Sequence, residues 1–511
     1  MPIFYTFLLV FLPVLSFLYF LPKISKNKSR CNPPGPLGLP LIGNLHQIDQ
    51  SSLHTSFLNL SKSYGPIVFL NLGFIPSVVV SSASLAKEVL KTQDLIFCNR
   101  PSTIAQRKFT YNKLDVVFSP YNDYFKQMKK LVNVHVLGLK RVQHSRHIRE
   151  DEVTLAMNMI HDLAHSSKHV NVSEIAKNVM STIVMRVGFG KRYEDGQERT
   201  KILGLIAGLQ GMITNLFVSD LWPGMPFVGL IDRLTGQIDR LEKCFQDLDS
   251  FYQELIDERV NAEYRKCHED DDDIIDILIQ LKKDRVMSNI ELTDNHIKAM
   301  LTDVLVAGTD ASAAIVIWAM TSLIKNPQIM KKTQDEVRNV VGKKGEVNED
   351  DLRKLTYLKT VTKEIMRLYP PAPLLVPRET NKDTILHGYE IKQKTMVHVN
   401  AWAIGRDPEL WENPEEFLPE RFLGSEVDFR GNDFELIPFG GGRRICPGIS
   451  MGVLMAELLL ANLVYLFDWS LLDGVKIEDI DYEVMPGLTM HKKNDLCLLA
   501  HVYLQEKDDR F

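Results

Sequence analysis

Apolar and polar positions along this chain follow patterns typical of helices, with shorter strand-like runs between them. Residues 2–21 are uncharged and mostly Leu, Phe, Val, Ile and Tyr. The longest helical pattern runs from about residue 293 to 325 and is closed by an Asn-Pro pair. Two further helical patterns cover residues 355–368 and 449–469. No Gly/Ser-rich or Pro-rich break follows residue 41, so the pattern predicts one large domain behind an N-terminal segment.

The N-terminal apolar run is long enough to cross a membrane as a helix, since its twenty residues would span roughly 30 Å. Basic residues follow it directly, at Lys23, Lys26, Lys28 and Arg30, and none precedes it. The positive-inside rule then places the bulk of the protein in the cytosol, with residues 1–22 as a single-pass anchor. A cleaved signal peptide is the alternative, but its basic n-region and small-residue cut site are absent.

The next stretch, residues 23–45, combines these basic side chains with clustered prolines, in Cys-Asn-Pro-Pro-Gly-Pro and Leu-Pro-Leu-Ile-Gly-Asn. Prolines make a stiff, extended spacer with a fixed exit direction. We expect a hinge that holds a catalytic domain, residues 46–511, at a set tilt on the membrane.

Composition removes several classes of function. A net charge of −5 and a pI near 6.3 argue against a nucleic-acid-binding protein, which would normally be basic. The six cysteines are far apart and form no Cys-x-x-Cys pair, so the sequence indicates neither a zinc site nor a disulfide framework.

A decapeptide near the C-terminus carries the strongest chemical signal. It contains Phe439, Gly442, Arg444, Cys446 and Gly448 in the spacing Phe-x-x-Gly-x-Arg-x-Cys-x-Gly. Glycines let a backbone fold tightly over a flat ligand, an arginine can pair with a propionate, and the helix that follows would stabilise a thiolate. A phosphate-binding loop would need a preceding strand and a following Lys-Ser/Thr pair, and both are missing. The motif predicts haem held by the Cys446 thiolate, a ligation that favours O–O cleavage.

With this motif the chain resembles the cytochrome P450 family, and within it the plant microsomal type, from about Pro33 to near the C-terminus. The resemblance implies a mainly α fold with a smaller β part (α+β), preceded by one N-terminal transmembrane helix. It implies haem b as cofactor and a place in the endoplasmic reticulum membrane, with the catalytic domain in the cytosol. No flavin or nicotinamide fingerprint is present, so an NADPH-cytochrome P450 reductase is the expected partner.

The middle of the longest helix, residues 307–312, reads Ala-Gly-Thr-Asp-Ala-Ser. Glycine and small polar residues are unfavourable there, so we interpret Gly308 as allowing a close approach to haem and Asp310 as passing protons inward. The family pattern has Thr, whose hydroxyl takes part in oxygen activation, where this chain has Ala311. Thr309 and the serine after Ala311 point elsewhere on the helix, by about 200° and 100°. The hypothesis is that the substrate itself assists proton delivery.

The resemblance also assigns residues outside these motifs. Glu364 and Arg367 share a helix face and, with Arg421, would form a buried network. Arg378 and Lys129 would bind the haem propionates, although Lys129 stands where the family has Arg.

The function implied is a monooxygenase that inserts one oxygen atom from O2 into a lipophilic small molecule of plant specialised metabolism. One alternative is coupling, rearrangement or dehydration without net oxygen insertion, and another is a non-catalytic haem sensor. The residues expected to contact the substrate are mostly apolar: Leu301, Val304, Ala307, Leu374, Leu375 and Leu488.

Overall fold

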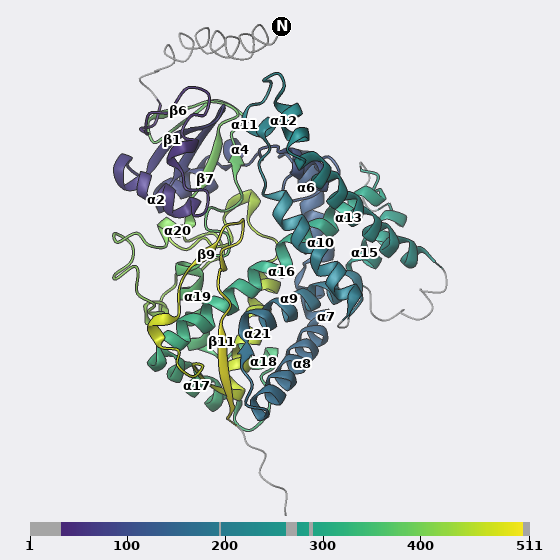
Figure 1. Ribbon diagram of the computed structural model, residues 1–511, viewed down its shortest axis with the longest axis vertical. Coiled ribbons are helices and arrows are strands. Elements are labelled where there is room, and N and C mark those ends of the chain that lie inside the picture. The colour runs from purple at the N-terminus through teal and green to yellow at the C-terminus, as the bar shows by residue number, and fades with distance from the viewer. Residues whose placement is uncertain (1–31, 194–195, 262–272, 286–289, 504–511) are drawn as a thin grey trace, which may run out of the picture.

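The computed structural model describes residues 32–193, 196–261, 273–285 and 290–503. The expected anchor, residues 1–22, and the first part of the expected hinge, residues 23–31, lie outside these ranges. Within them helices predominate, and a small sheet occupies one corner of the molecule (Figure 1). The predicted mainly α fold with a smaller β part is therefore confirmed.

The helices are, in chain order, α2 (Leu53–Tyr64), α3 (Ala83–Lys87), α4 (Asp94–Phe97), α5 (Ile104–Phe109), α6 (Asp123–Leu131), α7 (Leu139–His144), α8 (Arg146–His165), α9 (Val172–Phe189), α10 (Gln197–Ile213), α11 (Val218–Leu221), α12 (Val228–Leu234), α13 (Gln237–Val260), α15 (Ile274–Lys283), α16 (Asp294–Lys325), α17 (Pro327–Val341), α18 (Glu349–Leu352), α19 (Thr356–Leu368), α20 (Ala401–Ile404) and α21 (Ile449–Leu466). Short 3-10 turns include η4 (Pro419–Phe422) and η5 (Gly442–Arg444).

The strands are β1 (Ile67–Leu72), β2 (Ile75–Val80), β3 (Val170–Asn171), β4 (Arg378–Glu379), β5 (Thr384–Leu386), β6 (Tyr389–Ile391), β7 (Met396–Val399), β8 (Phe467–Ser470), β9 (Val484–Met485), β10 (His491–Lys492) and β11 (Cys497–Val502). The largest sheet has the order β1-β2-β7-β4, in which only β2 and β7 are parallel. Its edge strand β4 pairs Arg378 with Val397, which fixes Arg378 at the border between the sheet and the helices.

Helix α16 runs through the centre of the molecule (Figure 1). Every side chain from Ala313 to Ile324 is buried, so this half of the helix belongs to the core. It packs most extensively against α9 and also against α21 and α19. Burying apolar side chains on several sides explains why the helix is apolar nearly all round.

Helix boundaries follow the sequence signals in most places. Helix α16 ends at Lys325, and Pro327 becomes the first residue of α17, where its missing N–H is harmless. Helix α19 ends at Leu368, ahead of two prolines. The prediction that the last helix extends to residue 469 is wrong, because Phe467–Ser470 leaves the helix and pairs with β11 as strand β8.

Candidate active site

Cys446 lies in a tight loop directly before α21. Its backbone N–H donates to the carbonyl of Phe439 at 3.1 Å, and the Gly448 N–H donates to its sulfur. Burial raises the pKa of the Cys446 thiol, whereas the Gly448 N–H and the charge of Lys129 favour the thiolate. Because α21 begins at Ile449, its N-terminal dipole also lies beside the sulfur. The loop is thus built to hold a sulfur ligand.

Gly442 lets this loop pass close to the segment before α4. Its φ is +66°, and a Cβ there would lie 2.0 Å from the carbonyl oxygen of Leu90. Any other residue would collide with backbone in a conformation that L residues rarely adopt. Gly442 therefore allows a close approach between the cysteine loop and the backbone at Leu90.

Asp94, at the start of α4, binds two arginines of the site. Its Oδ1 accepts from Nη1 of Arg378 at 2.8 Å, and its Oδ2 accepts from the Arg443 N–H at 2.9 Å. Arg378 also donates to the Gly441 carbonyl at 2.9 Å. Asp94 is only 2% exposed, so it fixes both arginines around the loop. It was not predicted, because nothing in its local sequence marks it.

Arg444 donates to three backbone carbonyls, those of Cys98 at 2.8 Å, Val116 at 3.1 Å and Ser119 at 2.5 Å. Its guanidinium also lies 3.8 Å from the ring centroid of Phe125. Burial lowers the pKa of Arg444 to about 10.

Arg100 is a further buried arginine that the sequence interpretation missed. It donates to the carbonyls of Val117, Val376 and Pro377. Burial lowers its pKa well below the ordinary value, and the charges of Arg444 and Arg378 lower it further.

A cluster of three guanidinium groups, with Arg100 and Arg378 buried and Arg444 half-buried, decides whether haem suits the site. Their positive charges repel one another, and Asp94 and Asp115 are the acids that act on them. Two further carboxylates would relieve that repulsion. A planar cofactor with two propionates and an iron that takes a thiolate therefore fits the residues present.

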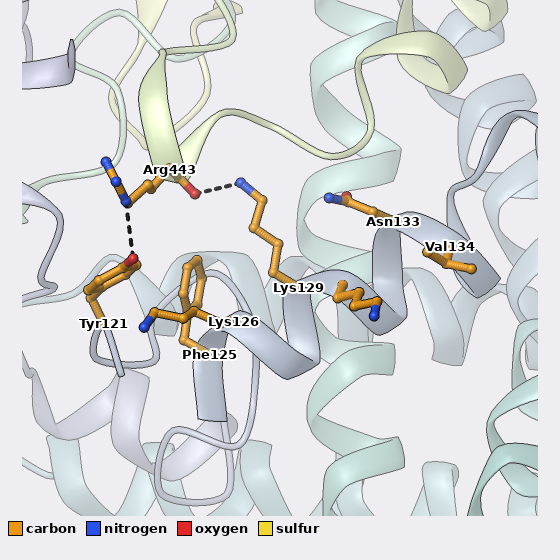
Figure 2. A pocket seen from close by; sticks show the side chains of 8 residues that line it. Tyr121, Phe125, Lys126, Lys129, Asn133, Val134 and Arg443 are labelled. Carbon is orange, nitrogen blue, oxygen red and sulfur yellow. Dashed lines mark hydrogen bonds between the residues drawn. The ribbon is translucent and has the colours of Figure 1, made fainter. Parts of the chain in front are cut away.

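Lys129, on α6, contacts the cysteine loop directly. Its Nζ donates to the carbonyl of Arg443 at 2.6 Å (Figure 2) and to the carbonyl of Ile445 at 3.1 Å. Burial lowers the pKa of Lys129 to about 8. Beside it lies a surface pocket of about 400 Å³, whose lining residues are Tyr121, Phe125, Lys126, Lys129, Lys130, Asn133, Val134 and Arg443.

Three small or hydroxyl-bearing residues in the middle of α16 face neighbouring helices. A Cβ on Gly308 would lie 2.9 Å from Val184, so the close approach that this glycine permits is to α9 and not to the haem side. The Thr309 hydroxyl donates to the Leu305 carbonyl within α16 and accepts from Gln210 of α10 at 3.3 Å. Ser312, on a further side, donates to a carbonyl of α21 at 3.2 Å. None of these groups replaces a hydroxyl at position 311.

Ala307 and Asp310 mark a different side of α16. Ala307 is exposed although its neighbours Leu305 and Thr309 are buried. The Asp310 Oδ2 lies 3.1 Å from Nε2 of His491, which is in β10. The pair was not predicted, since 181 residues separate the two positions and only the fold brings them together.

Buried hydrogen bonds join the three residues of the expected network. Arg367 donates to both Glu364 oxygens at 2.8 Å, and Arg421 Nε donates to Glu364 Oε1 at 3.1 Å. The Glu364 and Arg367 side chains are fully buried. Arg367 also donates to the carbonyls of Pro414 and Glu416, which ties α19 to the loop before η4.

The residues expected to contact the substrate lie in different surroundings. Leu301 is completely buried in the main core, and Val304 faces Gly188 of α9. Leu375 lies 3.7 Å from where a Cβ on Gly440 would stand, so it borders the cysteine loop. Leu374 packs against the core of the large sheet, and Leu488 is half-buried. Of this set, Ala307 is exposed and Leu375 borders the cysteine loop, whereas Leu301 is buried in the core and Val304 packs against α9.

Comparison with known proteins agrees with this geometry. A family model described as Cytochrome P450 matches residues 33–499. The 6,7,8-trihydroxycoumarin synthase of Pastinaca sativa is 46% identical over 481 residues, which cover 92% of this chain and 93% of that protein. Cytochrome P450 71A1 of Persea americana is 45% identical over 467 residues, covering 90% and 92%.

A solved structure of a zebra fish cytochrome P450 with progesterone has the same fold. It superimposes with a TM-score of 0.74 and 23% sequence identity, and the match covers 88% of this chain and 99% of that one.

Proposed function

This chain belongs to the cytochrome P450 family, and we propose that it hydroxylates a lipophilic aromatic small molecule of plant specialised metabolism while anchored to the endoplasmic reticulum membrane. Members of this family are haem-thiolate monooxygenases. The observation that carries the proposal is the Cys446 sulfur, which accepts the Gly448 N–H in a loop beside the arginines Arg100, Arg378 and Arg444.

Haem b, when bound, supplies the activation of O2 and the transfer of one oxygen atom to the substrate. Cys446 would hold its iron, within the loop that Phe439, Gly442 and Gly448 shape. Arg378, Arg444 and Arg100 would neutralise the propionates. Lys129 would support the loop through the two carbonyls it binds, and not by a direct propionate contact.

Proton supply is the step that this chain must arrange differently from its relatives with Thr at position 311. Asp310 is the acid on the exposed side of α16, and His491 is its partner. A proton moving from the imidazolium to the carboxylate breaks an N–H bond and forms an O–H bond, and solvent then reprotonates His491. A hydroxyl or amine on the substrate would complete the path that Ala311 leaves without a hydroxyl.

The substrate class rests on the relatives. The Pastinaca sativa relative that is 46% identical is named for a trihydroxylated coumarin. A second relative from the same plant is named 5-OH-xanthotoxin synthase. Both names describe hydroxylated aromatic products, which suits the apolar side chains expected around Ala307. Coumarins therefore head the panel of compounds to be tested.

Electrons would come from an NADPH-cytochrome P450 reductase that docks beside the cysteine loop. Lys126 and Lys130 are exposed there, and together with Lys129 and Arg443 they line the pocket shown in Figure 2. A basic surface of this kind attracts an acidic partner and speeds its association.

Membrane contact is supported by exposed apolar side chains that lie on α12 and on the first described residues of the chain. Phe227 and Leu234, on and beside α12, are each 78% exposed, and Leu37 is 77% exposed. These segments are linked, because Trp222 donates to the Leu41 carbonyl at 2.8 Å. We propose that this side faces the lipid, with residues 1–22 as the anchor and residues 23–45 as the hinge before the catalytic domain, residues 46–511.

A second candidate function is an oxidation without net oxygen insertion, such as coupling, rearrangement or dehydration. Ala311 favours it, because the nearby hydroxyls of Thr309 and Ser312 are directed to other helices.

One experiment tests both functions. The protein is co-expressed with a plant reductase and supplied with coumarins under ¹⁸O2. A thiolate-type ferrous carbonyl spectrum with label in a hydroxylated product supports the first function. An unlabelled product supports the second, and absence of bound haem overturns both.

A further inference from the structure

Two carboxyl groups, Asp115 and Asp303, meet between α16 and the loop that follows α5. Asp115 is completely buried, and among the described residues no donor reaches its Oδ1. Asp303 is the neighbouring acid, and it can hydrogen-bond to Asp115 when one of the two carries a proton. Asp303 Oδ2 accepts the backbone N–H of Val116 at 2.8 Å and of Val117 at 3.3 Å. Asp115 Oδ2 accepts the N–H of Phe118 at 2.5 Å. The backbone N–H groups of three successive loop residues therefore have these two carboxyl groups as their hydrogen-bond acceptors.

The carbonyl groups of the same loop face the arginines of the haem site. Val117 O accepts from Arg100 at 3.0 Å, and Val116 O and Ser119 O accept from Arg444 at 3.1 Å and 2.5 Å. The loop is held on one side by acids and on the other by guanidinium groups. It therefore connects α16 with the arginines that would neutralise the haem propionates.

Two carboxylates in contact at a buried site repel each other strongly, so such pairs retain a proton. Burial raises the pKa of Asp303 well above its ordinary value, and the neighbouring charge of Asp115 raises it further. Burial also raises the pKa of Asp115, but the Phe118 N–H and Arg444 act in the opposite direction. Both directions favour the shared proton on Asp303, from which it can be donated to Asp115.

The other titratable groups around the pair do not compete for this role. Arg100, Arg444 and Lys113 carry positive charge that favours an ionised Asp115. Tyr124 and Tyr252 remain neutral, because burial raises the pKa of both phenols.

We propose that Asp115 and Asp303, sharing one proton, are positioning residues that hold the loop of residues 116–119 against α16. Loss of the proton would put two negative charges in contact and release the loop. The importance of this loop for the substrate rests on the proposed function. Asp303 lies one helical turn from Ala307, so the loop would close over the same side of α16.

Amide hydrogen exchange on the full-length protein in detergent tests the proposal without a substrate. The readout is the protection of Val116, Val117 and Phe118, corrected for the intrinsic pH dependence of exchange. We expect protection in the wild type to fall about tenfold or more as pH rises from neutrality into the alkaline range.

Asp303→Asn mimics the protonated acid, since its oxygen still accepts the two N–H groups and its NH2 group donates to Asp115. It should keep the loop protected at every pH, whereas Asp303→Ala should lose protection throughout. Asp294→Asn, at the exposed start of α16, is the control and should follow the wild type.

Equal protection of the wild type at neutral and alkaline pH overturns the proposal. So does a pH-dependent loss in Asp303→Asn, which can no longer lose that proton. These results are independent of the reaction catalysed, so a failure of the proposed function would be seen separately, in the carbonyl spectrum and the products.

Discussion

Asp310 Oδ2 lies 3.1 Å from Nε2 of His491, a contact that joins the middle of α16 to the short strand β10. The residues on either side of His491 are anchored. Met490 accepts from the indole of Trp318 at 2.8 Å, and Lys492 binds Asp481 at 3.0 Å. His491 is therefore held in place beside the acid that we assign to proton supply.

Replacing either member of this pair should lower the amount of product formed per NADPH consumed. Asp310→Asn should lower turnover by about 10²-fold, because general acid–base groups contribute on that scale. His491→Gln keeps a donor near Asp310 but cannot pass on a proton, so we expect about a several-fold loss of product per NADPH. Product, NADPH and hydrogen peroxide are measured together. If His491→Gln keeps the wild-type ratio, His491 has no part in proton supply.

Restoring the family's hydroxyl with Ala311→Thr should help some substrates more than others. Compounds without a hydroxyl or amine near the reacting carbon should give more product per electron, since they lack a donor of their own. Compounds that carry such a group should change little. An unchanged yield in both groups would contradict substrate-assisted proton delivery.

The buried Glu364 should be essential for stability. Glu364→Ala leaves Arg367 and Arg421 without their shared acid, and breaking a buried ion pair in this way costs about 3–5 kcal/mol. Urea unfolding of the holoprotein measures the loss. Lys332→Ala is a suitable control, because its pair with Glu420 is exposed and should contribute about 1 kcal/mol or less. Similar losses in the two variants would argue against the network.

Glu457 should make stability depend on pH. Burial inside the fold raises the pKa of this α21 carboxyl from 4.5 to about 7. The folded state therefore holds the proton more tightly, and stability is lost as pH rises from about 4.5 through about 7. Glu457→Gln should remove this loss and stabilise the protein above pH 7 by roughly 3 kcal/mol at most. Unfolding curves at acidic and alkaline pH measure the effect, and parallel losses in both proteins would exclude Glu457 as the cause.

Reversing charge at Lys126 and Lys130 should slow electron transfer from the reductase. Both side chains are exposed beside the cysteine loop, so Lys126→Glu with Lys130→Glu should lower the reduction rate about tenfold at low salt. Stopped-flow reduction under carbon monoxide gives the rate, and ligand binding should be unaffected. Lys62→Glu on α2 provides the control. Equal rates in both variants would place the docking surface elsewhere.

Local signals allowed much of the fold to be predicted. The ends of α16 and α19 follow from prolines, which act within a turn of their own position. The boundary of α21 was missed because β8 depends on pairing with β11, about thirty residues further along. A strand defined by a distant partner leaves little trace in its own residues.

The candidate site divides in the same way. The spacing around Cys446 is a local motif and could be recognised in the sequence. The partners of Arg444 come from residues 98, 116 and 119, and Asp94 reaches both Arg378 and Arg443 across the fold. Such contacts exist only after the chain has folded, so sequence reasoning named the arginines but not the groups that hold them.

The orientation of Gly308, Thr309 and Ser312 has a consequence for how this enzyme can be varied. Each of the three is committed to a different neighbouring helix, whereas Ala311 remains partly exposed. A substitution at position 311 can therefore alter reactivity without disturbing the architecture, and neighbouring positions do not offer that independence. Selection, or a protein engineer, has one residue here at which catalytic behaviour can be adjusted on its own.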